Sequence, residues 1–169
     1  MANAAANERG AGDSVLLEFD PANFNPDNKF REIADQIFPG RYGPRGTSPA
    51  EVLLHELVRA MRTVKGMGDQ SSAGNGWWSV EEFVATLVTN IHVSERNTGG
   101  LRGGYGGYPA MTANWVTSEG FLADAENRRL VKYLYRQDPF LCRDLARTVY
   151  VNSFNPVRLR LNPFTTSAI

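Results

Sequence analysis

Two amphipathic segments with matching start signals constrain the fold more than any other feature of this chain. Residues 48–51 (SPAE) supply an N-cap serine, a proline at the first helical position and a glutamate that can close a capping box. Apolar residues then recur at helical spacing until Lys65-Gly66, where the run ends. Residues 79–82 (SVEE) repeat the start signal, and a second helical series runs to about Ser94. The two patterns predict two helices.

Weaker patterns predict further elements. Residues 15–19 (VLLEF) form a short apolar run before Asp-Pro, which is typical of a strand. Helical spacing also occurs over 30–38, 124–135 and 139–149, with Asp138 placed to cap the last of these segments. The chain from Asn152 onward is expected to be extended.

Together these elements predict an α+β fold that is mostly helical, with a few short strands. We expect a single domain over 14–169, since 169 residues can bury one core without disulfides or metal. Residues 1–13, rich in Ala, Asn and Gly, are expected to be a disordered tail. Six of the sixteen glycines fall within 97–109, which predicts a glycine-rich surface loop.

Composition excludes several classes of protein. A formal net charge of zero argues against a dedicated nucleic-acid binder, which normally carries a basic excess. No apolar run approaches the roughly 18 residues that span a bilayer, so we expect no membrane insertion. The first residues contain no apolar core of a signal peptide, which predicts a cytoplasmic protein, or one exported by a signal-independent machine. Cys142 is the only cysteine, and it is expected to be a buried structural thiol.

His55 and Glu56 are the residues with the clearest chemical potential, and they lie inside the first predicted helix. Zinc peptidases use H-E-x-x-H on a helix, because residues four apart share one face and two histidines can then bind one zinc ion. The glutamate between them activates the bound water. Here the fourth residue after His55 is Arg59, not histidine.

The surrounding motifs make a resemblance more specific. SPAEVLLHELVRAMR, EEFVATLVTNIHVSE, Leu101-Arg102 and FNPVR occur in this order. Together they resemble a family of bacterial effector-type zinc metallopeptidases (zincins), whose pattern is HELxHA, EEFxAxxxTNIYxSE, LRxDHxG and FNPxR. The resemblance covers roughly residues 48–110 and 152–158. It implies an α+β zincin fold with the metal between two helices, and an association with bacterial secretion or contractile injection machinery.

The resemblance also implies roles for individual residues. His55 matches the first zinc-binding histidine, and Glu56 matches the catalytic glutamate. Glu82 matches the acidic residue before phenylalanine that would be the third ligand, with Glu81 as the alternative. If the site is active, the cofactor is zinc.

Four positions depart from the family pattern. Arg59 replaces the second histidine, Gly104 and Tyr105 stand where the acid and histidine of LRxDHxG would be, and His92 replaces a tyrosine. Arginine stays protonated and has no lone pair for a metal. We therefore expect Arg59 to occupy the metal position and to pair with Glu82 or Glu56, in a site that holds no cofactor. His92 is expected to be a surface or partly buried histidine, about 15 Å along the helix from Glu82.

The favoured interpretation is a catalytically degenerate zincin-like protein that acts as a structural or interaction component. It could be a cargo, adaptor or effector of a secretion or contractile injection system, with a protein partner or self-assembly. Trp77, Trp78, Tyr105 and Tyr108 are candidate interaction residues, because aromatic side chains concentrate in interface hot spots. The two tryptophans could equally cap the core.

Two other interpretations remain open. An active zinc metallopeptidase would use an atypical ligand set, with Glu56 as general base and Tyr105 or Tyr108 steadying the oxyanion. Alternatively, the chain is an unrelated helical domain, in which His55 is an ordinary helical residue and the glutamates at 81 and 82 interact with the helix dipole. A second helix packed far from His55 would favour this last interpretation.

Overall fold

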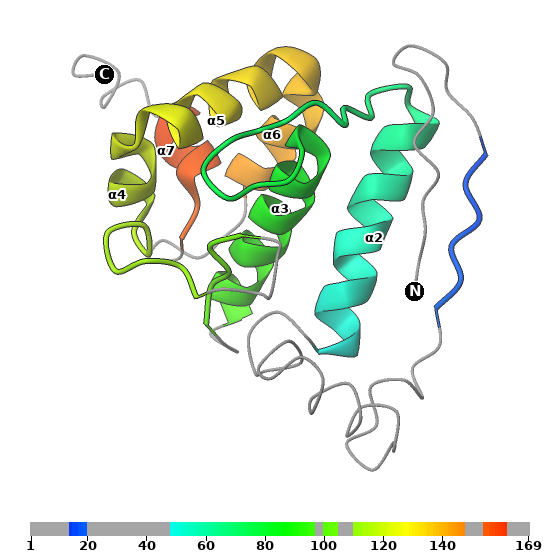
Figure 1. The fold of residues 1–169 in the computed structure, drawn as a ribbon, viewed down its shortest axis with the longest axis horizontal. Coiled ribbons are helices and arrows are strands. Elements are labelled where there is room, and N and C mark those ends of the chain that lie inside the picture. Colours follow the sequence, from blue (N-terminus) through cyan, green and yellow to red (C-terminus); the bar gives the residue numbers. More distant parts are fainter. Residues whose placement is uncertain (1–13, 20–47, 97–99, 105–109, 148–153, 162–169) are drawn as a thin grey trace.

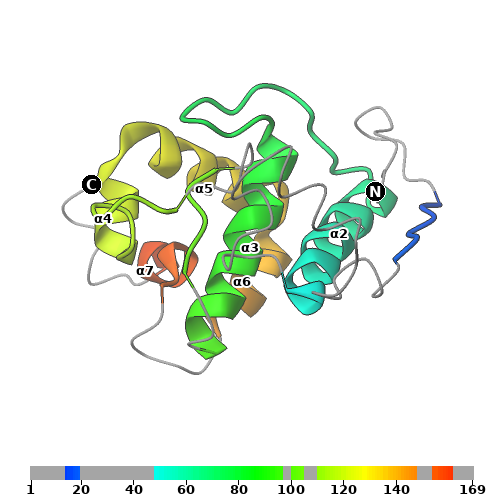
Figure 2. The ribbon, with the colours of Figure 1, turned by 60° about the horizontal axis from the view of Figure 1, so that its bottom comes forward.

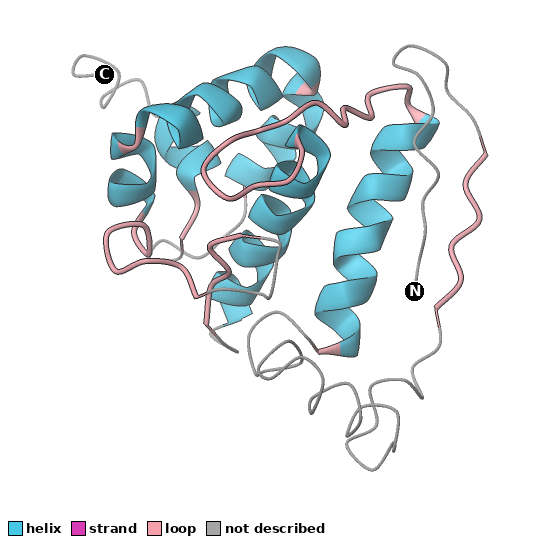
Figure 3. Cartoon of the chain, in the orientation of Figure 1, coloured by secondary structure: helices cyan, strands magenta, loops and turns pink. Residues whose placement is uncertain are grey.

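The computed structural model describes residues 14–19, 48–96, 100–104, 110–147 and 154–161 (Figure 1). These residues form helices joined by loops, and no β-sheet occurs among them (Figure 3). The helices are α2 (Pro49–Val64), α3 (Val80–Arg96), α4 (Ser118–Ala123), α5 (Ala125–Gln137), α6 (Pro139–Ala146) and α7 (Pro156–Leu161). The mostly helical prediction is confirmed.

The predicted strand over 15–19 is wrong. This segment has no regular secondary structure, and β-type pairing in the described part of the chain is limited to two isolated bridges, Gly74–Trp77 and Arg102–Ala110. An apolar run becomes a strand only when a neighbouring strand completes its hydrogen bonds. The predicted tail over 1–13 and the predicted helix over 30–38 lie outside the described residues.

Helix α2 begins and ends where its sequence signals predict. The Ser48 hydroxyl accepts a hydrogen bond from the Glu51 amide at 3.3 Å, and the Glu51 carboxylate accepts one from the Ser48 amide at 3.4 Å. Lys65 caps the other end, and Gly66 follows with a φ of 67°, a conformation that favours glycine. The helix therefore has fixed bounds and a defined register.

Helix α3 lies at the centre of the described fold. Figures 1 and 2 show α2 on one side of it and α4, α5 and α7 on the other. Every residue from Val80 to Ile91 is buried, including Glu81 and Glu82. Since the helix is covered all round, its polar side chains must find partners inside the protein.

The second half of the chain adds short capped helices. Asp138 caps α6, as predicted, and Asp124 caps α5. Helix α4 was not predicted, and the expected extended course from Asn152 onward is wrong over α7. Helix α7 starts at Pro156, directly after Asn155. The side-chain oxygen of Asn155 accepts a hydrogen bond from the amide of Arg158 at 2.9 Å.

Aromatic rings join the two halves of the core. The Phe83 ring of α3 contacts Trp77 edge-on, with 5.3 Å between centroids, and stacks against Phe121 of α4 at 6.2 Å. Phe121 in turn meets Phe154 at 5.3 Å. These contacts fix α3 against the C-terminal helices, and α2 then packs on the remaining face of α3. No helix in the described ranges is both long and apolar enough to cross a bilayer.

Candidate functional site

The candidate site lies between α2 and α3, where His55 meets Glu82. Nε2 of His55 lies 3.0 Å from Oε2 of Glu82, although 27 residues separate them in the chain. Both residues are buried, with 4% and 5% of their surface exposed. The second helix therefore packs directly against His55, so the distant packing that would favour an unrelated helical domain does not occur.

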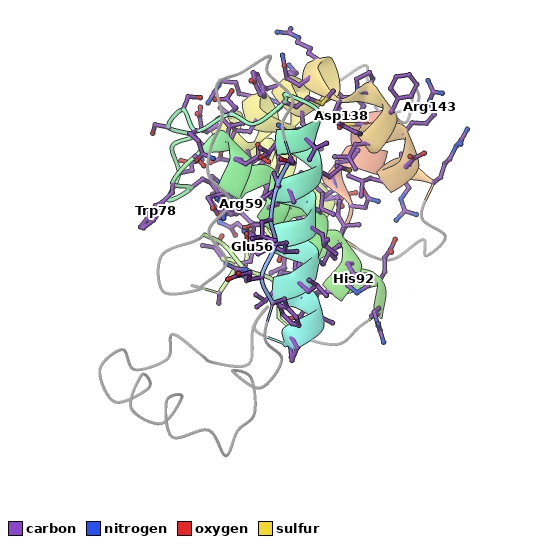
Figure 4. All side chains as sticks on the ribbon, turned by 90° about the vertical axis from the view of Figure 1, so that its right-hand side faces the viewer. Glu56, Arg59, Trp78, His92, Asp138 and Arg143 are labelled. Carbon is purple, nitrogen blue, oxygen red and sulfur yellow. The ribbon has the colours of Figure 1, made fainter. Side chains whose placement is uncertain are left out.

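Arg59 joins this pair from the next turn of α2. Its Nη1 atom lies 3.2 Å from Oε1 of Glu82 and 3.2 Å from Oε2 of Glu56. One guanidinium nitrogen thus contacts a carboxylate on each helix. Arg59 was expected to pair with Glu82 or Glu56, and it pairs with both. Figure 4 shows Arg59 and Glu56 on the same side of α2.

Of the two hydrogen bonds of a capping box, Glu82 takes part in the one made by its backbone amide, while its carboxylate contacts α2. The Ser79 hydroxyl accepts a hydrogen bond from the Glu82 amide at 3.2 Å, as in a capping box. The carboxylate of Glu82 points to α2, where its two oxygens contact His55 and Arg59. The local signal in the sequence was correct for the helix start, but the side chain takes partners on the neighbouring helix.

Glu81 belongs to a second ion pair and not to the candidate site. Its two carboxylate oxygens accept hydrogen bonds from Nε of Arg62 at 3.0 and 3.1 Å. The amide of Asp69 donates to the same carboxylate at 3.3 Å, and Arg62 Nη2 donates to the carbonyl of Met67 at 2.9 Å. Of the two glutamates left open by the sequence, Glu82 is the one beside His55.

The sequence interpretation missed Arg62, although a signal for it was present. His55, Arg59 and Arg62 stand at positions i, i+4 and i+7, which share one face of a helix. That face of α2 meets the glutamates at the start of α3. The HExxH motif gives a role only to the first two of these positions, so the sequence analysis assigned none to Arg62.

Burial shifts the ionisation of two glutamates, Glu56 and Glu81. Burial raises the pKa of Glu56, and the neighbouring Arg59 and His55 lower it in part. Burial likewise raises the pKa of Glu81, against the opposing effect of Arg62. The arginines thus offset part of the cost of placing carboxylates between two helices.

The other predicted residues lie in several places. His92 is partly exposed and lies away from Glu56 and Arg59 (Figure 4). Tyr105 and Tyr108 lie outside the described residues, so the structure does not place them. Trp77 is 3% exposed and its Nε1 donates to Asn127 at 3.2 Å, so of the two alternatives left open for it, interaction surface or core, the structure has it in the core. Trp78 is 69% exposed.

The Leu101-Arg102 segment is tied to α3. The side-chain oxygen of Asn90 accepts a hydrogen bond from the Arg102 amide at 2.9 Å, and its amide group donates to the Arg102 carbonyl at 2.8 Å. Gly103 is needed here, because a Cβ atom at this position would lie 2.9 Å from the carbonyl oxygen of Ala110. Two of the segments that carry the family resemblance therefore contact each other.

The donors between α2 and α3 do not fit a catalytic zinc ion. Such an ion takes three protein ligands and one open position. His55 and Glu82 supply two, while the side chain of α2 one turn after His55 is Arg59, a permanent cation without a lone pair. Among the described residues no group of three His, Cys, Asp or Glu side chains has a geometry that could hold a metal ion.

Comparison with known proteins gives no relative. No family model, no curated protein and no solved structure matches the chain. The zincin resemblance therefore stays a prediction that depends on the motifs themselves.

Proposed function

We propose that this protein acts by binding and not by catalysis, as a zincin-like chain whose metal site has become an internal ion-pair network. One observation carries the proposal. Nη1 of Arg59 lies 3.2 Å from both Glu56 and Glu82, the residues that would serve as general base and metal ligand. A single side chain thus engages both groups.

The chemistry of zinc-dependent hydrolysis explains why this contact matters. The reaction needs a metal ion with an open position for water and a carboxylate free to take the proton of that water. In the network the carboxylate of Glu56 pairs with a guanidinium, and the oxygens of Glu82 are shared between His55 and Arg59. Neither carboxylate is left for its catalytic role.

A binding role also needs a surface, and Trp78 is the best candidate in the described part of the chain. Its side chain is 69% exposed, but its neighbours are fixed, because Trp77 is anchored in the core and Ser79 caps α3. A large aromatic side chain on rigid backbone loses little entropy on binding and is typical of a hot spot. We propose a protein partner, or a second copy of the chain, as its target.

The family resemblance supplies a cellular context for the proposal. Effector-type zincins are associated with bacterial secretion and contractile injection machinery, and a non-catalytic relative would serve there as cargo, adaptor or effector. The proposed context depends on the motifs alone, whereas the proposed loss of catalysis is supported by the contacts of Arg59.

Zinc stoichiometry on tag-free protein tests the loss of catalysis. We expect far less than one zinc ion per chain by elemental mass spectrometry, and no peptide hydrolysis that depends on Glu56. About one tightly held zinc per chain, with hydrolysis lost in Glu56→Ala, would show that the protein is a working metallopeptidase.

The surface is tested by light scattering coupled to size exclusion. We expect assembly of the chain, or its complex with a partner, to weaken in Trp78→Ala. Phe140→Ala is a matched control, because Phe140 is 67% exposed and its neighbour Arg143 lies on the opposite side of the protein from Trp78 (Figure 4). Equal behaviour of the two variants would remove Trp78 from the proposal.

A further inference from the structure

We propose that the guanidinium of Arg59 is a built-in cation in a site that is otherwise shaped for a metal ion, so that residue 59 alone decides whether the site takes zinc. This inference rests on the proposed function, because it assumes that the protein with Arg59 holds no zinc there. It adds that His55 and Glu82 lie where a third ligand at residue 59 would complete a zinc-binding set.

The first reason is that residues 55 and 59 already converge on one carboxylate. They lie one helical turn apart on the same face of α2. His55 contacts Oε2 of Glu82 at 3.0 Å, and Arg59 contacts Oε1 at 3.2 Å. An imidazole at position 59 would point in the same direction but would be shorter than arginine, leaving space in front of Glu82 for an ion. The donors would then be two histidines and one glutamate, an established zinc set.

The second reason is that the donors are held in place by contacts that do not involve Arg59. The capping box fixes the start of α2, and Ser79 fixes the backbone of Glu82. The Arg62–Glu81 ion pair ties α2 to α3 one turn beyond the site. A substitution at residue 59 therefore leaves both helices in register.

The third reason is the charge of the site. Glu56 and Glu82 carry two negative charges when ionised, and Arg59 returns one positive charge. If Arg59 is replaced by a neutral side chain, two buried carboxylates remain without a cation. The charge of such a site favours a divalent ion, because burial strengthens the interaction between charges, but residue 59 must still supply a third ligand to hold the ion.

The experiment compares zinc uptake by tag-free protein with Arg59, Arg59→His and Arg59→Gln. Each protein is stripped with chelator, equilibrated with zinc, dialysed and assayed by elemental mass spectrometry, and its melting temperature is measured with and without zinc. We expect Arg59→His to gain about one zinc ion per chain and to melt at a higher temperature with zinc. Arg59→Gln is the matched control, since it removes the cation without adding a ligand, and should gain none. Cobalt added to Arg59→His should give the absorption bands of a tetrahedral site.

The double variant Arg59→His/His55→Ala identifies the ligands, and it should lose the zinc gained by Arg59→His. Arg59→Cys guards against poor folding of the histidine variant, since a thiolate also binds zinc. If Arg59→His and Arg59→Cys both stay zinc-free, or both fail to fold even with zinc, the inference is wrong while the proposed function stands. If the protein with Arg59 itself binds one zinc, the proposed function fails instead.

Discussion

Nε of Arg62 lies 3.0 and 3.1 Å from the two carboxylate oxygens of Glu81, and neither side chain exposes more than 1% of its surface. This pair links α2 to α3 in parallel with the contacts of Arg59. The two helices are therefore joined by two arginine–glutamate interactions, one wholly buried and one at the edge of the core.

Replacing one partner of the buried Arg62–Glu81 pair should lower the free energy of unfolding more than replacing both partners. Arg62→Met leaves Glu81 buried without its cation, and we expect the free energy of unfolding to fall by about 3–5 kcal/mol. The double variant Arg62→Met/Glu81→Leu removes both charges and should recover most of that loss. Urea unfolding of the two variants checks this, and equal losses in both would contradict the role given to the pair.

Gly103 should not tolerate a side chain. In Gly103→Ala the new Cβ would lie 2.9 Å from the carbonyl oxygen of Ala110, so the backbone must shift and we expect a loss of about 1–3 kcal/mol. Gly68→Ala is the control, because its Cβ would meet only Thr63, whose nearest atom, Oγ1, lies at an ordinary 3.6 Å. Thermal unfolding distinguishes the two, and a similar melting temperature for both variants would show that the 101–103 segment is less tightly held.

Truncation of the two adjacent tryptophans should have very different effects on stability. Trp77→Ala removes a buried ring that contacts Phe83 and bonds to Asn127, and should cost about 3–5 kcal/mol of stability. Trp78→Ala removes an exposed ring and should change stability by about 0.5 kcal/mol or less. Denaturant unfolding measures both. A large loss in Trp78→Ala would mean that this ring supports the fold instead of an interface.

Cys142 should be unreactive while the protein is folded. Burial raises the pKa of its thiol from 9.0 to about 12, and Asp138 adds to the shift. Between these pH values the unfolded chain loses the thiol proton and the folded chain keeps it, so the contribution of this group to stability falls as pH rises. Alkylation at pH 8.5 should be very slow until denaturant is added. Rapid alkylation of the folded protein would show that α6 opens locally.

The sequence predicted the helices with strong local signals and failed where structure depends on distant residues. Ser48 and Glu51 lie within one turn, so the start of α2 can be read from the chain. The run at 15–19 could not be assigned correctly, because strand formation depends on a partner elsewhere in the chain. Helix α7 was missed although its start has a local signal, with Asn155 as its cap and a proline as its first residue. What the chain does not show is the bond from the Asn155 side chain to the carbonyl of Leu145 at 2.8 Å.

The candidate site was likewise predicted where its signal is local and left open where it depends on packing. Its residue types and spacing pointed to His55, Glu56 and Arg59 on one helix. The choice between Glu81 and Glu82 could not be made from the chain, since neighbouring residues on a helix point about 100° apart and the rotation of α3 decides which one faces His55. That rotation is set by packing of the core aromatics, such as Phe83 against Trp77 and Phe121.

The contact of Arg59 with both helices has a consequence for where the protein can work. A metal ion that joins two helices must be supplied by the surroundings, and competing chelators can withdraw it. The guanidinium is attached covalently to α2 and keeps its charge at any physiological pH. This link between α2 and α3 is therefore complete as soon as the chain folds, and it stays intact in a compartment from which free zinc has been withdrawn.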